Sequence, residues 1–179
     1  MKQRSLSEPI APYVQHRLGQ VRQAAVNALI ATGGEAAVAA LRDGLRSQDA
    51  AVRGLSASGL GALGDPAAVP DLFLALDHNV GEAATSIGQL CDDASCLELA
   101  QRLGRAQFDV ITSGLEQVLF RSDERVKPAT KVKVVQRIGG LETKEAAEFL
   151  LSLKERLPKS TDAAVMKALT DAIVNIRGR

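Results

Sequence analysis

Two cysteines lie close together in the middle of the chain, and cysteine is a residue type that could bind a metal or exchange electrons. Cys91 and Cys96 are five positions apart, and two aspartates directly follow the first of them. A zinc site needs about four ligands at close spacing. The two histidines of the sequence, His16 and His78, form no ligand pattern with these residues. We therefore predict neither a metal nor a cofactor.

Catalytic patterns are also missing from the sequence. It contains no Ser-His-Asp arrangement, no glycine-rich phosphate loop and no HExxH-like spacing. The doublet Asp92-Asp93 could be a carboxylate pair, but a helix-capping role for Asp92 explains it without chemistry. We expect that the chain is not an enzyme.

Four basic residues follow one another at helical spacing in the second half of the chain. They are Lys127, Lys131, Lys133 and Arg137, and they include two like-charged i,i+4 pairs, which weaken an isolated helix. One interpretation is a solvated helix face. The alternative is nucleic-acid or other polyanion binding through the helix 127–137, although the lack of interleaved aromatic residues argues against single-stranded nucleic acid.

The sequence around these residues contains an internal repeat, which determines the elements that position them. Val21-Arg22 recurs as Val52-Arg53 at a spacing of 31. A third copy follows at a spacing of 27, in which Leu60, Leu63, Asp65, Val69, Leu72 and Leu76 correspond to Ile87, Leu90, Asp92, Cys96, Leu99 and Leu103. A period of about 30 residues is typical of architectures in which each unit buries its apolar face against its neighbours.

Apolar periodicity and turn residues predict the helices of these repeats. We expect helices at 11–18, 20–31, 35–46, 51–63, 66–76, 80–90, 94–104, 107–120 and 161–176, and a further pair between 123 and 157 that turns at Gly139-Gly140. The helix 107–120 matches no turn signature and lies out of phase with the pairs. Residues 1–9 are predicted to be a loose or disordered tail, and residues 10–179 a single domain.

Three glycines interrupt the helix predicted at 51–63. Gly54, Gly59 and Gly61 each cost about 1 kcal/mol relative to alanine in a helix. We infer tight contact with a neighbouring helix at Gly59 and Gly61, with local mobility as the alternative.

The stretch 49–76, DAAVRGLSASGLGALGDPAAVPDLFLAL, resembles the short bacterial HEAT repeat, also called the HEAT-like repeat of phycobiliprotein lyases. The match is good at 21–45 and partial at 77–103 and 123–157. The resemblance implies an all-α, right-handed α-solenoid of stacked antiparallel helix pairs, and an Asp-Arg ladder that involves Arg22, Asp49 and Arg53. It implies no particular activity, because the same repeat serves lyases, scaffolds, adaptors and nucleic-acid binders.

In HEAT-like rods the second helix of each pair lines the concave side, so the resemblance also predicts a binding surface. A helical wheel places one ridge of the second helices opposite their core stripe: Ala40 and Asp43, then Asp71 and Leu74, then Glu98 and Gln101. We expect an acidic concave ridge with an apolar spot at Leu74. Its partner would be another protein with a basic or amphipathic segment.

The leading hypothesis is therefore a non-enzymatic scaffold or adaptor that binds a protein partner on this ridge. Polyanion binding is the second hypothesis, and an enzyme of the bilin-lyase kind is the third.

The overall composition adds two expectations. A net charge of +1 argues against a general affinity for polyanions or membranes. The sequence has no apolar run of about 20 residues and no signal-peptide pattern, so we expect no membrane contact and a cytoplasmic location in which both cysteines are reduced.

Overall fold

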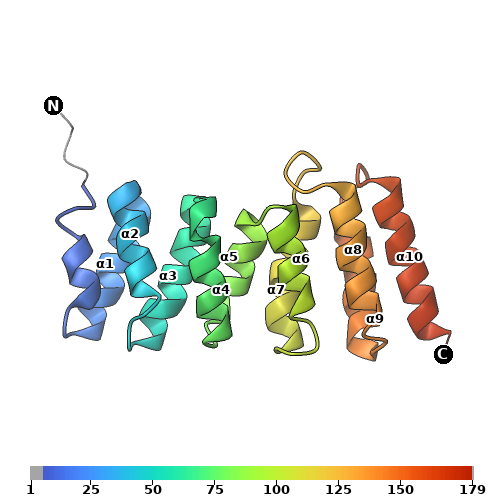
Figure 1. The fold of residues 1–179 in the computed structure, drawn as a ribbon, viewed down its shortest axis with the longest axis horizontal. Helices are drawn as coiled ribbons and strands as arrows, with labels where there is room; N and C mark the ends of the chain where they lie inside the picture. Colours follow the sequence, from blue (N-terminus) through green and yellow to red (C-terminus); the bar gives the residue numbers. More distant parts are fainter. Residues whose placement is uncertain (1–5, 179) are drawn as a thin grey trace. The chain divides into compact units, whose positions relative to one another are not determined.

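The protein is built of helices throughout residues 6–178, the part of the chain that the computed structural model describes (Figure 1). Ten α-helices and two short 3-10 helices lie in this range. The α-helices are α1 (Gly19–Thr32), α2 (Glu35–Gly44), α3 (Ala50–Leu63), α4 (Val69–Asp77), α5 (Glu82–Leu90), α6 (Asp93–Gln101), α7 (Phe108–Phe120), α8 (Pro128–Gly139), α9 (Lys144–Arg156) and α10 (Ala163–Arg177), and the 3-10 helices are η1 (Ala11–Gln15) and η2 (Pro66–Ala68). The predicted class, an all-α solenoid of HEAT-like helix pairs, is confirmed.

The chain divides into two compact units, Met1–Leu90 and Cys91–Arg179. They are called here the N-terminal unit and the C-terminal unit. The prediction of a single domain over residues 10–179 stays a prediction. Of the predicted loose tail, residues 1–5 lie outside the described residues. Residues 6–9 form a turn in which the Ser7 side chain is fully buried.

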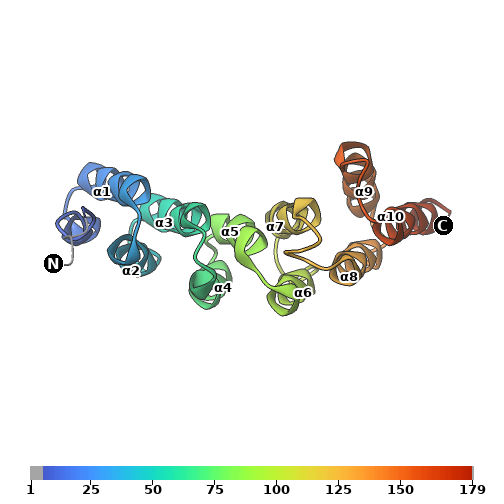
Figure 2. The ribbon, with the colours of Figure 1, turned by 90° about the horizontal axis from the view of Figure 1, so that it is seen from above.

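In the N-terminal unit, α1, α3 and α5 pack against one another in one row, and α2 and α4 lie in a second row (Figure 2). Leu29, Leu41, Leu60 and Leu72 are fully buried between the rows, as their recurrence in the repeat predicts. Asp65 marks the turn between α3 and η2, because its carboxylate accepts a hydrogen bond from the Ala67 backbone and caps η2.

The glycines of α3 lie where the row is most tightly packed. A Cβ atom at Gly59 would lie 2.6 Å from Cγ1 of Ile30 in α1, and one at Gly61 would lie 2.6 Å from Oγ of Ser86 in α5. Real Cβ atoms essentially never come so close to a neighbour. The inference that these glycines permit close helix packing is confirmed.

In the C-terminal unit, α6, α8 and α10 pack in one row, and α7 and α9 form the other (Figure 2). The helix predicted at 107–120 is present as α7, and although it is out of phase in the sequence it belongs to a helix pair. It packs against α6, so that α6 pairs with α7 and α8 with α9, and α10 covers both helices of the second pair. No helix in the described part of the chain is long and apolar enough to cross a bilayer.

Candidate functional site

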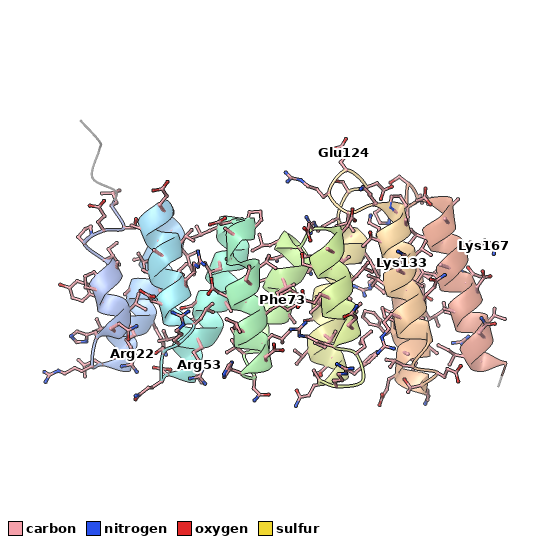
Figure 3. The ribbon with its side chains drawn as sticks, viewed as in Figure 1. Arg22, Arg53, Phe73, Glu124, Lys133 and Lys167 are labelled. Carbon is pink, nitrogen blue, oxygen red and sulfur yellow. A yellow bond between two sulfur atoms is a disulfide. The ribbon has the colours of Figure 1, made fainter. Side chains whose placement is uncertain are left out.

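One pair of the predicted Asp-Arg ladder, Arg22 with Asp49, is present at the start of the N-terminal unit. Arg22 donates through Nη2 to Oδ2 of Asp49 at 2.6 Å, and through Nη1 to the carbonyls of His16 and Arg17. Arg53 repeats the carbonyl contacts one repeat later, at 2.8 Å and 3.0 Å from two backbone oxygens (Figure 3). The hydrogen bond from Arg22 lowers the pKa of Asp49. These residues hold helix starts to preceding loops, which is a structural role.

The first half of the predicted ridge lies on α2 and α4. The Leu74 side chain is 57% exposed, whereas Leu72 and Leu76 on the same helix are buried. Asp43 is exposed on α2, but Ala40, also predicted on the ridge, is buried. The outward orientation of Leu74 therefore agrees with the helical wheel.

Asp71, one turn before Leu74, does not contribute a free negative charge. Its Oδ2 lies 2.5 Å from a terminal nitrogen of Arg42, and its Oδ1 lies 3.8 Å from one of Arg46. Both arginines come from α2, so the ion pairs connect the two helices. The predicted acidic character is therefore wrong at Asp71, which pairs with two arginines, whereas Asp43 is exposed. We call the set Arg42, Asp43, Arg46, Asp71 and Leu74 the Leu74 surface.

The two arginines are the residues that the sequence argument missed. Arg42 precedes its partner by 29 positions, and Arg22 precedes Asp49 by 27. A basic residue slightly less than one repeat before an aspartate was therefore the signal that could have revealed them.

The second half of the ridge belongs to the C-terminal unit. Glu98 and Gln101 are exposed on α6, and Glu98 forms an i,i+4 ion pair with Arg102 at 3.2 Å. This carboxylate is also locally neutralised. A continuous ridge through both units stays a prediction.

The four basic residues of 127–137 do not form one exposed face. Lys131 is only 4% exposed, and its Nζ donates to the backbone oxygen of Arg121 and to Oδ1 of Asp123. The sequence places Lys131 one turn before Val134 and Val135, so it begins the buried stripe of α8. A buried, neutralised lysine cannot bind phosphate at the surface, and the predicted basic face is wrong at this position.

The other three basic residues of α8 and its N-cap differ in surroundings. Lys127 is 3.5 Å from Asp93, and Arg137 donates to the backbone oxygen of Leu103 at 3.1 Å. Lys133 is exposed (Figure 3). Two of the three thus hold α8 to α6 or to the loop that follows it.

Cys91 and Cys96 form a disulfide, with their Cα atoms 5.3 Å apart, and both are fully buried. The prediction that they are reduced is wrong, because the start of α6 folds them together. Asp92 and Ser95 form a reciprocal capping box there, which confirms the capping role predicted for Asp92 and brings the flanking cysteines within bonding distance. The cytoplasmic location rested partly on reduced cysteines and stays a prediction.

Arg121 completes this cluster from the end of α7. It donates through Nη1 to the carbonyl oxygen of Cys91 at 2.7 Å and lies 3.7 Å from the Cys91 sulfur. Burial lowers the pKa of Arg121, and the nearby charge of Arg125 lowers it further. The disulfide, Arg121 and Lys131 thus hold the α7–α8 loop against the start of α6.

Both histidines have backbone partners. Nδ1 of His16 accepts from the Leu18 amide at 3.2 Å, and Nδ1 of His78 lies 2.7 Å from the carbonyl of Leu74. Over residues 6–178, no group of three or more His, Cys, Asp or Glu side chains is arranged to hold a metal ion.

The repeat geometry agrees with a known family. The family model for HEAT repeats matches residues 7–82. This stretch is similar to HEAT repeats. It covers the N-terminal unit nearly to its end and corresponds to the part of the sequence where the 31-residue spacing is kept. HEAT repeats generally serve as protein-interaction scaffolds.

One solved structure extends the likeness in fold to nearly the whole chain. Human deoxyhypusine hydroxylase in complex with glycerol is 14% identical, with a TM-score of 0.54, over 97% of this chain and 85% of that one. An engineered protein is 16% identical over 96% of both chains, with a TM-score of 0.42. At these identities the likeness concerns the fold alone. No curated protein gives a significant match to the sequence.

Proposed function

We propose that the chain is a non-enzymatic protein-interaction scaffold that binds its partner on the Leu74 surface. The observation behind this proposal is the exposure of Leu74 in an otherwise well-packed repeat. The residues two positions before and after it are buried leucines, so α4 has a complete core stripe without it. An exposed leucine on the opposite face adds nothing to that core and is available to a partner.

The surroundings of Leu74 have the composition of an interface. An apolar anchor with a polar, charged rim is the usual arrangement at protein-protein contacts, and arginine is enriched there. Arg42 and Asp71 form a short ion pair between α2 and α4, and only 16% of the Asp71 side chain is exposed. The rim is thus held in place before binding, which reduces the entropy lost when a partner docks.

The charges of the Leu74 surface indicate a narrower class of partner segment than the sequence alone predicted. The Leu74 surface carries two arginines and two aspartates, so a purely basic segment would be repelled as much as attracted. An amphipathic segment fits better, with an apolar side chain for Leu74 and charged groups of both signs for the rim. Polyanion binding through 127–137 is not proposed, because Lys131 is buried and Lys127 is paired.

A matched pair of substitutions tests this function. Leu74→Asp and Val174→Asp each place a carboxylate at an aliphatic residue of similar exposure, 57% and 62%, in different units. Neither should change the free energy of unfolding by more than about 0.5 kcal/mol, the usual range for surface sites. Thermal melts of the purified variants check this.

Capture from native lysate after nuclease treatment, quantified by mass spectrometry, measures partner binding. Leu74→Asp should weaken capture of the specific partner by about 30-fold, as expected for an interface anchor worth about 2 kcal/mol. Val174→Asp should retain it. Equal capture by wild type and Leu74→Asp, with both folded, would exclude the Leu74 surface as the binding site.

A further inference from the structure

A second surface lies on the side of α2 that packs against η1. Between these elements is an open hollow of about 440 Å³, a size within the usual range of ligand-binding clefts. It is lined by Glu8, Ala11, Pro12, Val14, Gln15, Ala36, Ala39, Ala40 and Asp43. Six of these nine residues are alanine, proline or valine. We call it the η1–α2 groove.

The groove exists because both of its walls are built from small elements. The α2 wall presents alanines at positions 36, 39 and 40, and η1 is a 3-10 helix of five residues. None of the residues that line the groove has a long apolar side chain that could fill it. The same N-terminal segment exposes two large apolar residues, Leu6 at 76% and Tyr13 at 52%. The segment thus has more apolar surface than its own fold covers.

The charged residues of the groove have a single sign. Glu8 and Asp43 line it, and none of its other lining residues is charged. Neither carboxylate forms an ion pair with another residue in the described range 6–178. Asp43 belongs to the Leu74 surface as well, but the arginines of that surface do not line the groove. The groove therefore combines an apolar floor with a negative rim.

We propose that the η1–α2 groove binds a short basic amphipathic segment of a partner protein. Small aliphatic side chains of that segment would pack on the alanine floor, and its lysine or arginine side chains would approach Glu8 and Asp43. Charge complementarity selects this occupant, because an acidic segment would meet two carboxylates and a neutral one would leave them without partners. This interaction does not involve Leu74, which lies on α4.

Selection from a random peptide display library tests the proposal on the chain itself. The bait is the full chain, and the enriched peptides are then synthesised and their affinities measured by fluorescence anisotropy. We expect enrichment of peptides that combine lysine or arginine with aliphatic residues, and weaker binding as salt is added. Enrichment of acidic or uncharged peptides, or of none, would overturn the proposal.

Two variants with matched controls locate the binding. The double substitution Glu8→Arg and Asp43→Arg should reduce affinity at least tenfold, whereas Glu124→Arg with Glu155→Arg makes the same change in net charge at exposed sites of the C-terminal unit and should not. Ala39→Phe fills the groove and should also reduce the affinity. Its control, Ala62→Phe, places the same side chain at another exposed helical alanine and should not. Equal affinities for each variant and its control would contradict the assignment.

Two further measurements distinguish peptide binding in the groove from binding at the Leu74 surface and from self-association of the chain. Leu74→Asp should leave the affinity for the selected peptides unchanged, so failure at one surface does not decide the other. Sedimentation velocity measures self-association of wild type and of Ala39→Phe, and we expect no self-association that depends on the groove. If wild type self-associates and Ala39→Phe abolishes that association, the groove is occupied by a second copy of the chain and the proposed partner is wrong. Circular dichroism of every variant confirms that it is folded.

Discussion

The two units differ in the particular contacts that link their helices. In the N-terminal unit, small residues let α1, α3 and α5 approach closely, and the hydrogen bond from Ser86 to the carbonyl of Ala57 is buried between two of them. In the C-terminal unit, where Gly139 also packs closely against Ala172, several links between larger or charged side chains are added. They comprise the disulfide, the Lys131–Asp123 pair, the Arg156–Glu116 pair between α9 and α7, and the edge-on contact of Phe108 with Phe149.

This difference explains why the family signature ends where it does. A repeat signature records residues that recur because each unit meets its neighbour in the same way. Leu29 and Leu60, and likewise Leu41 and Leu72, are buried residues that recur at the 31-residue spacing, and the family match at 7–82 contains them all. A disulfide or a buried lysine forms a contact that occurs once, so it produces no periodic pattern in the sequence. The fold continues into the second unit although the signature does not.

The largest expected effect concerns the shared core of the N-terminal unit. Leu72→Ala removes a fully buried side chain and should cost about 2 to 5 kcal/mol of unfolding free energy. Leu74→Ala, two residues later on the same helix, removes an exposed leucine and should change stability by less than about 0.5 kcal/mol. Urea denaturation of both variants measures the contrast, and similar midpoints would show that the assigned register of α4 is wrong.

The next effect concerns the link specific to the C-terminal unit. Opening the short loop closed by Cys91 and Cys96 should cost about 2 kcal/mol on the loop-entropy model. A dithiol reductant should therefore lower the melting temperature of wild type but not of a Cys91→Ala, Cys96→Ala double variant. Hydrogen exchange should quicken in α6 more than in α3. Equal melting temperatures of wild type with and without reductant would show that the disulfide does not stabilise the fold.

A smaller effect tests close packing in the N-terminal row. Gly61→Ala gains about 1 kcal/mol of helix propensity, but its Cβ would lie 2.9 Å from the Ser86 Cβ and displace that side chain. Overpacking costs about 1 to 3 kcal/mol, so we expect a net loss. Ser58→Ala, at an exposed site of the same helix, should be neutral or slightly stabilising. A stabilised Gly61→Ala protein would refute the packing role of this glycine.

The smallest effect distinguishes two buried serines of the same unit. Ser86 donates to the Ala57 carbonyl at 2.8 Å, whereas the Ser56 hydroxyl is buried without a hydrogen-bond partner among the described residues. Ser86→Ala should lose about 1 kcal/mol, and Ser56→Ala should be neutral or gain up to about 1 kcal/mol. Chemical denaturation measures both signs, and a loss on Ser56→Ala comparable to that of Ser86→Ala would show that Ser56 is paired.

Much of the fold could be predicted because its determinants are local or periodic. Asp65 and Asp92 cap the helices that follow them, and a cap is recognised from residues within one turn. The core leucines recur with the repeat. The position of α7 could not be derived in this way, since its pairing with α6 depends on which neighbour covers its apolar stripe rather than on any turn signature.

The candidate site was less predictable because it depends on contacts between elements. Leu74 was correctly placed on the surface by the helical period, but its charged rim was not, since Arg42 meets Asp71 only when α2 and α4 are stacked. Lys131 looked like a surface residue from its type alone. Its position one turn before Val134 and Val135 was the overlooked sign of burial. The groove has no sequence motif, because it is a space left by small residues on two separate elements.

The central functional claim is that a protein partner contacts Leu74, and site-specific photo-crosslinking in the native host tests it most directly. A benzophenone amino acid is introduced at position 74 and, as a control in the same unit, at the exposed position of Ala67. Irradiation followed by mass spectrometry identifies any protein joined to either site. We predict a discrete protein adduct at position 74 that is absent at position 67. No discrete adduct at position 74, or the same adducts at both positions, would contradict the claim.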